Sequence, residues 1–199
     1  MENELKEAAR YLPPYLLPKQ REQLFEEIRS FPEKANYYLA RNTYANEMLQ
    51  GDGSGEFKYF DPLTGKEQQV KGLLLSNSCD ISTNNQRTLP VKVLFSPLLK
   101  LDLYLRRVAN SKGEQRAQSI AKAIKDQCIT SIFYLPASEQ LPFETIALLD
   151  NVVSIPLNHC IEQRPEKLFC LSQFGFYLFI MKLSIHLTRY QEEIARFDG

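Results

Sequence analysis

The chain has 199 residues and a mass of 23.0 kDa, which fits one domain with additions or a small domain with a helical appendage. Hydrophobic residues make up 44% and charged residues 24% of the sequence, which predicts a folded protein and excludes general disorder. The 24 basic residues are balanced by 24 acidic ones. This balance excludes a protein that binds nucleic acid through its overall charge and leaves a local basic face open.

Cysteine spacing and apolar segments indicate the compartment. The four cysteines include no CxxC pair, which argues against a zinc ribbon or a disulfide scaffold and predicts reduced thiols in the cytoplasm. The first residues lack the apolar core of a secretory signal. Residues 168–183 are apolar but contain polar residues and fall short of about 20, so we expect a buried helix and no membrane association. Without metal-ligand spacing, we expect no metal and no cofactor.

Residues 1–50 are predicted to form a helical extension. Apolar residues at helical spacing predict one helix before Pro13 and a second after Pro18. A third helix is expected through the apolar residues Tyr37, Tyr38, Tyr44 and Met48. The glycine-rich run 51–55 should end the helical part, because glycine at this density favours turns.

Residues 55–199 are expected to form a sheet with helical additions. Short runs rich in β-branched, aromatic and leucine residues predict strands at 57–60, 70–75, 91–95, 129–135 and 145–155. The pattern predicts a helical insertion at about 99–128 and a long C-terminal helix at about 171–197. The expected class is α+β, built on a small barrel or a strongly twisted sheet.

The segment GEFKYFDPLTGKEQQVKGLLLSNSCDIS predicts a hairpin with its turn at Asp61, Pro62 and Gly65. Its residues Phe60, Asp61, Pro62, Gly65, Glu67, Gln68 and Leu73–Ser76, with the later LLDNVVSIPLN of Leu148–Asn158, resemble the MazF/PemK family of toxin endoribonucleases. The resemblance implies an SH3-like β-barrel, a homodimer, an antitoxin or other protein partner, and an RNA-directed role in a prokaryotic toxin or defence system. The resemblance does not cover the N-terminal helices or the helical insertion, which would be additions to the barrel.

The resemblance also implies where catalysis would occur. In the family, an arginine before the second strand and a threonine or serine after the next strand act on the scissile phosphate. The matching positions here fall on Val70 and near Leu98. An active enzyme would be a metal-independent endoribonuclease that relies on replacements, and the candidate catalytic residues are Lys71, Ser76, Cys79 and Asp80. Lys71 would stabilise negative charge, and Asp80 or a histidine would move the proton.

Two interpretations of the loop residues and the histidines stay open. Cys79 and Asp80 could be a nucleophile and its partner if a histidine approached them, or a small packed residue and a turn residue. His159 and His186 could belong to a site or be ordinary surface or buried histidines.

The insertion is the most basic part of the chain. Residues 100–126 hold seven basic and three acidic side chains. The predicted nucleic-acid contacts are Arg106, Arg107, Lys122 and Lys125. A solvated helix face would explain the same charges.

A second function is kept beside RNA binding: a barrel without catalysis that docks a protein partner through its terminal helices. The aromatic residues of the C-terminal helix fit a core role, and one face of that helix could meet the N-terminal helices or a second subunit.

Overall fold

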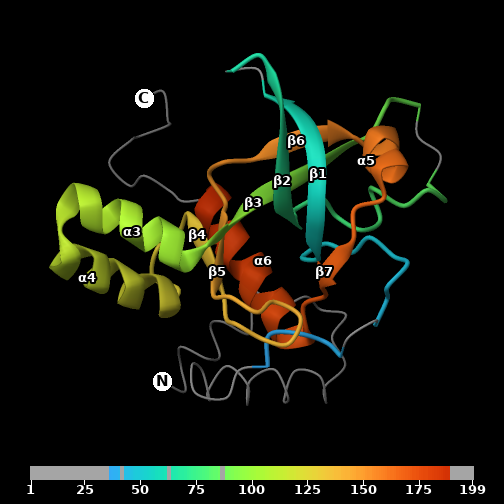
Figure 1. Ribbon diagram of the computed structural model, residues 1–199. Coiled ribbons are helices and arrows are strands. Elements are labelled where there is room, and N and C mark those ends of the chain that lie inside the picture. The colour runs from blue at the N-terminus through green and yellow to red at the C-terminus, as the bar shows by residue number, and fades with distance from the viewer. Residues whose placement is uncertain (1–35, 41–42, 62–63, 86–87, 189–199) are drawn as a thin grey trace, which may run out of the picture.

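The computed structural model describes residues 36–40, 43–61, 64–85 and 88–188 (Figure 1). In these residues the chain is α+β, as predicted, with four helices and a seven-stranded antiparallel sheet. The strands are β1 (Gly53–Asp61), β2 (Lys66–Leu74), β3 (Lys92–Lys100), β4 (Ile132–Leu135), β5 (Thr145–Leu148), β6 (Val153–Pro156) and β7 (Lys167–Phe169). The helices are α3 (Leu101–Lys112), α4 (Glu114–Lys125), α5 (Leu157–Gln163) and α6 (Gln173–Thr188).

Strand β3 organises the sheet. The strand order is β4-β5-β3-β2-β1-β7, and β6 also pairs with β3. On one side β3 pairs with β2, and on the other it pairs first with β6, through residues 92–95, and then with β5, through residues 98–100. The sheet is open, because β4 and β7 form its two ends. The two halves of β3 therefore lead to two different parts of the molecule.

The β1–β2 hairpin confirms the predicted turn. Asp61 accepts a hydrogen bond at its backbone oxygen from the Gly65 N–H at 2.9 Å, and Gly65 has φ +66°. The Asp61 carboxylate accepts further hydrogen bonds from Thr64 and Gln68. The strand starts earlier than predicted, at Gly53, where a Cβ would lie 2.2 Å from the Phe169 ring. Glycine is thus needed here for close packing within a strand rather than for a turn.

The helix expected through Tyr37 and Met48 is wrong in the described residues. Tyr38 forms an isolated antiparallel bridge to Leu171, and Tyr44 lies in the left-handed region with φ 54°. The Leu39 N–H donates to Cys170 O at 2.9 Å, and the Tyr38 and Phe169 rings meet at a centroid distance of 5.2 Å. Pairing and aromatic packing across the fold outweigh the local helical spacing. The two helices predicted before residue 36 lie outside the described residues.

Further boundaries differ from the predictions. The run 145–155 is two strands, because a turn over Leu149 and Asp150, closed by the Asn151 N–H on Leu148 O at 3.0 Å, separates β5 from β6. The insertion is a pair of helices, α3 and α4, and the run at 129–135 becomes a strand only from Ile132. Helix α5 and strand β7 were not predicted. Helix α6 is described to Thr188, and its expected continuation to 197 lies outside the described residues.

Three hydrophobic cores hold the elements together. The first packs α6 against the sheet, with Phe174 and Phe179 fully buried, so the aromatic residues of this helix do have a core role. The second lies on the other face, where Phe57 and Phe95 meet beside Cys160 of α5. The third attaches α3 and α4 to β4 and β5. In the part of the chain that the structure describes, no helix is long and apolar enough to cross a membrane.

Candidate functional site

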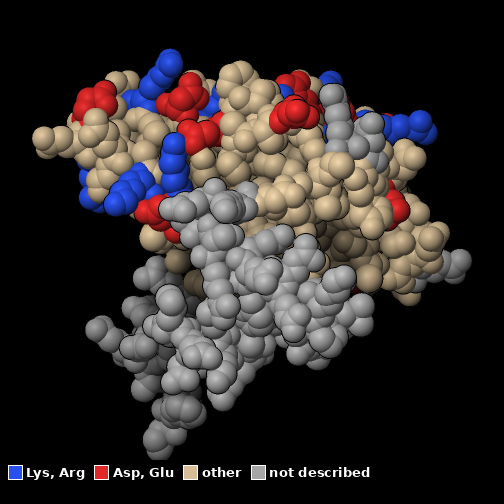
Figure 2. All heavy atoms as spheres, turned by 90° about the horizontal axis from the view of Figure 1, so that it is seen from below, with Lys and Arg blue, Asp and Glu red and all other residues tan. Residues whose placement is uncertain are grey.

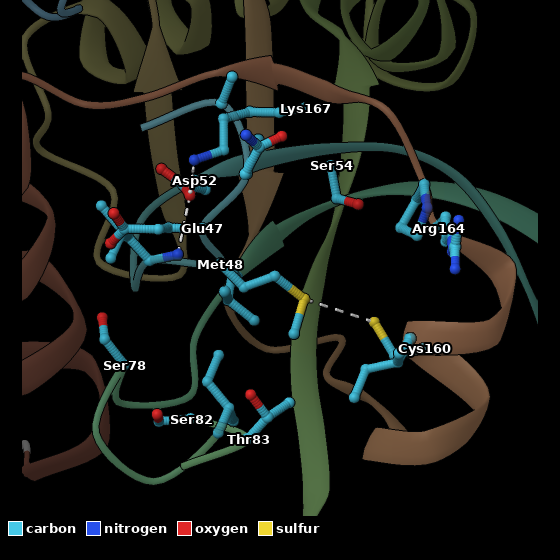
Figure 3. Close-up of a pocket in the computed structure, with 18 of the residues that line it drawn as sticks. Glu47, Met48, Asp52, Ser54, Ser78, Ser82, Thr83, Cys160, Arg164 and Lys167 are labelled. Atoms are coloured by element: carbon cyan, nitrogen blue, oxygen red, sulfur yellow. Dashed lines mark hydrogen bonds and ion pairs between the residues drawn. The ribbon is translucent and has the colours of Figure 1, made fainter. Parts of the chain in front are cut away.

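A cavity of about 930 Å³ lies beside the second core, at the β6 end of β3 (Figure 3). Four segments line it: the turn at 45–49, the start of β1 at 52–54, the loop at 78–84 and the end of α5 with the chain that follows at 160–167. Leu74 and Phe95 of the sheet add apolar surface. The α3–α4 pair lies at the opposite end of the molecule (Figure 1).

The loop that lines the cavity is built from local hydrogen bonds. The Asn77 side chain accepts from the Cys79 N–H at 2.9 Å, and Ser76 Oγ accepts from the Leu94 N–H at 2.9 Å, which fixes the loop on β3. Ser78 Oγ accepts from the Gln50 N–H at 2.9 Å and joins the loop to the turn before β1. These short polar residues compete with strand pairing and favour a turn. They explain why β2 ends at this point.

A buried ion pair forms one wall of the cavity. Lys167 Nζ lies 2.7 Å from Asp52 Oδ2, and the Asp52 and Lys167 side chains are 5% and 16% exposed. Asp52 Oδ2 also accepts from the Leu49 N–H at 2.8 Å, and Lys167 Nζ donates to Tyr44 O at 2.7 Å. Burial raises the pKa of Asp52, although Lys167 and the Leu49 N–H oppose that shift. The pair ties the start of β1 to β7.

Two sulfur atoms face each other at the cavity centre. Cys160 Sγ lies 3.9 Å from Met48 Sδ (Figure 3). Burial raises the pKa of the Cys160 thiol to about 11, and burial with the nearby Asp52 carboxylate raises that of Cys170 to about 12. Both thiols are therefore protonated at neutral pH, and neither is a ready nucleophile.

The structure separates the residues predicted to be catalytic. Cys79 is exposed and lines the cavity, with exposed Asp80 next to it in the same turn. Lys71 is exposed on β2 but projects from the face opposite Val70 and Gly72, because side chains alternate along a strand. Ser76 is half-buried and holds the Leu94 N–H. Only Cys79 and Asp80 are thus brought together.

The positions that match the family's catalytic arginine and threonine carry packing residues. Val70 is half-buried against the second core, and Leu98 is half-buried against the first. Exposed His159 on α5 and half-buried His186 on α6 do not line the cavity. Among the described residues there is no group of three histidine, cysteine or acidic side chains that could hold a metal ion.

The predicted nucleic-acid contacts lie together on the α3–α4 pair. Arg106, Arg107, Lys122 and Lys125 are all exposed, and Lys and Arg side chains gather over this end of the molecule in Figure 2. Arg106 forms an exposed pair with Asp102 at 3.7 Å, and Lys125 Nζ lies 2.7 Å from Glu144. Burial alone would raise the pKa of Glu144, but Lys125 and the Tyr134 hydroxyl lower it. In the part of the chain that the structure describes, Arg107 and Lys122 form no ion pair.

Comparison with known proteins identifies no similar family or protein. The chain matches no protein-family model and no curated protein.

Sequence reasoning did not find the Asp52–Lys167 pair. The two residues are far apart in the chain, and Asp52 lies in a glycine-rich run that is typical of a turn. A carboxylate in such a run is ordinarily solvent-exposed, so the sequence carried no signal of its burial.

Proposed function

We propose that this chain is a cytoplasmic RNA-binding protein of a prokaryotic toxin or defence system, with an SH3-like, MazF/PemK-like barrel as its centre. In this proposal the α3–α4 pair contacts the RNA backbone. The observation that carries it is the concentration of exposed basic side chains on α3 and α4, which hold six basic and two acidic residues in a chain of zero net charge.

The geometry of the two helices supports phosphate contacts. The two helices follow each other through Gly113 alone and pack as a pair against β4 and β5, so their basic residues belong to one rigid unit. Arg107 and Lys122 are free of the ion pairs that engage Arg106 and Lys125, among the described residues. Basic side chains that neutralise phosphates release counterions, which makes binding strong at low salt.

Binding is better supported than cleavage by the family mechanism. Val70 and Leu98 are aliphatic and pack in two different cores, so neither can stabilise charge on a phosphorane. Lys71 and Cys79 are on different sides of the sheet, which argues against one active site made from both. Homodimerisation and an antitoxin partner stay predictions from the resemblance.

The test measures the affinity of the full chain for a short, labelled single-stranded RNA of mixed sequence by fluorescence anisotropy. We compare wild type with the triple variant Arg107→Gln, Arg116→Gln, Lys122→Gln, in which Arg116 is a further exposed basic residue of α4. If three phosphate contacts are lost, the slope of log affinity against log salt should fall by about 2, and affinity at low salt should drop at least about tenfold.

The matched control removes the same charge elsewhere, through Lys58→Gln, Lys66→Gln and Lys92→Gln on exposed strand positions. Equal losses in both triple variants would reject the helix pair as the RNA-binding surface. No RNA binding by wild type at low salt would reject the proposal and favour the protein-binding module. Metal-free incubation with the same RNA, with Lys71→Ala alongside, tests cleavage separately on a denaturing gel.

A further inference from the structure

We propose that the cavity beside the second core is a binding site for a nucleoside monophosphate, either free or as one residue of an RNA strand. The base would lie on the apolar surface, a carbonyl oxygen or ring nitrogen of the base would face Lys167, and the phosphate would meet Arg164 at the rim. This inference goes beyond the basic helix pair and does not require it, because the cavity lies at the other end of the molecule.

The size and floor of the cavity fit a flat organic ligand. Its volume of about 930 Å³ lies within the range of about 300–1,000 Å³ typical of small-molecule sites. Phe95 and Ile81 are only 1% and 2% exposed, so the apolar surface open to a planar ring comes from half-buried Met48 and Leu49 and exposed Ile161. The flexible Met48 thioether can adapt to and contact an aromatic system.

The polar groups of the cavity retain hydrogen-bonding capacity. Two of the three N–H groups of Lys167 reach Asp52 and Tyr44, so one is left for a ligand oxygen. The Ser78 hydroxyl accepts from Gln50 and can still donate its own proton. Ser54 forms no side-chain hydrogen bond among the described residues. In Figure 3, Ser54 and Lys167 lie above Met48, whereas Ser82 and Thr83 lie below it, so polar groups flank the apolar centre.

Arg164 supplies the argument for a phosphate. It is an exposed lining residue at the end of α5 and adopts φ 44° and ψ 57°, a left-handed conformation that is uncommon outside glycine, asparagine and aspartate. This conformation is common where a helix ends, so it is the exposed guanidinium at the cavity, and not the backbone, that suits a phosphate. Three residues of chain span at most about 10 Å, so one small molecule can touch both Arg164 and Lys167. The planar guanidinium matches a phosphate.

The acidic lining residues limit the negative charge that a ligand in this cavity can carry. Glu47 and Glu166 line the same cavity, and Asp52 already neutralises Lys167. A triphosphate would meet repulsion from these carboxylates, whereas one phosphate at the rim needs only Arg164. The site therefore favours a monophosphate over nucleotides with longer phosphate chains.

The test is isothermal titration calorimetry of the full chain with AMP, GMP, CMP and UMP, their nucleosides and inorganic phosphate. We expect at least one monophosphate to bind, and its nucleoside to bind at least about tenfold more weakly. If no monophosphate binds more tightly than about 1 mM, the proposal is overturned.

Two variants locate the ligand. Arg164→Gly removes the guanidinium at a position whose backbone suits glycine, so the fold should be kept, and it should weaken the monophosphate about tenfold while leaving the nucleoside unchanged. Ser54→Val fits a strand and should weaken both ligands. Lys66→Gln, at an exposed position of β2 outside both proposed sites, is the control and should change neither. Wild-type affinity in both cavity variants would reject this cavity as the site.

A competition experiment between the monophosphate and labelled RNA shows whether the ligand is a free nucleotide or part of an RNA strand. If the base belongs to RNA, the monophosphate will displace labelled RNA, and Arg164→Gly will lower RNA affinity. If the ligand is a free nucleotide, it will bind without displacing RNA. Loss of RNA binding in the helix-pair variant with unchanged monophosphate binding would separate this inference from the RNA-binding proposal.

Discussion

At the Lys92 end of β3, Asp52 and Lys167 form an ion pair whose side chains are 5% and 16% exposed. At the Lys100 end, Asp102 and Arg106 on α3 form a pair whose side chains are 59% and 76% exposed. Both pairs join an aspartate to a basic side chain, but their burial gives them different roles. Buried charges must be matched, whereas exposed charges remain free to exchange partners with a phosphate. The first region is suited to a defined small ligand and the second to a polyanion.

The largest expected effect comes from removing Lys167. Lys167→Met leaves the Asp52 carboxylate buried without its cation, and we expect the free energy of unfolding to fall by about 3–5 kcal/mol in denaturant titrations. Lys58→Met is the matched control, because Lys58 pairs with Glu67 on the exposed surface, and it should cost no more than about 1 kcal/mol. Similar losses in the two variants would remove the distinction between the two kinds of pair.

A smaller effect is expected where the helix pair meets α6. Lys182 is buried, and its ammonium donates to the Gln127 carbonyl just after α4. Burial lowers the pKa of Lys182 to about 8, although Cys128 opposes the shift, whereas the unfolded chain keeps the ordinary value of 10.5. Between these values the unfolded state binds more protons, so this group makes stability rise with pH.

The measurement compares the free energies of unfolding of wild type and Lys182→Met at about pH 7.5 and about pH 9. The wild type should gain about 1 kcal/mol relative to the variant over this interval. A difference between the two proteins that does not change with pH would contradict the lowered pKa. The comparison would show whether the helix-pair end of the molecule also contains a buried charge that lowers the free energy of unfolding at neutral pH.

The smallest effect on stability is expected at the exposed pair. Asp102→Asn removes the partner of Arg106, and we expect the free energy of unfolding to change by less than about 0.5 kcal/mol. RNA affinity should rise severalfold at low salt, because α3 loses a negative charge and Arg106 is released. Anisotropy titrations would check this, and a fall in affinity would count against α3 as an RNA-binding surface.

The sequence predicted what is local in this fold. Turn chemistry and short apolar runs located the β1–β2 hairpin, and helical spacing located α4 and the start of α6. The alternating leucines of residues 99–105 left the type of α3 ambiguous, although the insertion as a whole was predicted to be helical. It failed where distant segments decide the structure. Tyr37 and Tyr38 fit a helical spacing pattern in the sequence, but their rings pack against Phe174 and Phe169, which are distant in the chain. The break between β5 and β6 was visible in Asp150 and Asn151, which favour turns.

For the candidate site, the sequence indicated the 76–80 loop and the basic insertion, and the structure places Cys79 on a cavity and the basic residues on exposed helices. It could not show that Lys71 and Cys79 lie on different sides of the sheet. The cavity itself depends on Asp52 and Lys167, whose pairing follows from the packing of β7 beside β1. No local pattern reports such a contact.

The pairing of β1 with β7 also fixes an order of events during synthesis. Tyr44 and Lys167, which contact each other beside the cavity, are 123 residues apart, and Met48 and Cys160 are 112 residues apart. Helices α3 and α4 are adjacent in sequence and can form as soon as they leave the ribosome. A nascent chain would thus carry its basic helix pair well before the cavity has all its walls, and the proposed nucleotide site would form only after synthesis has passed Lys167.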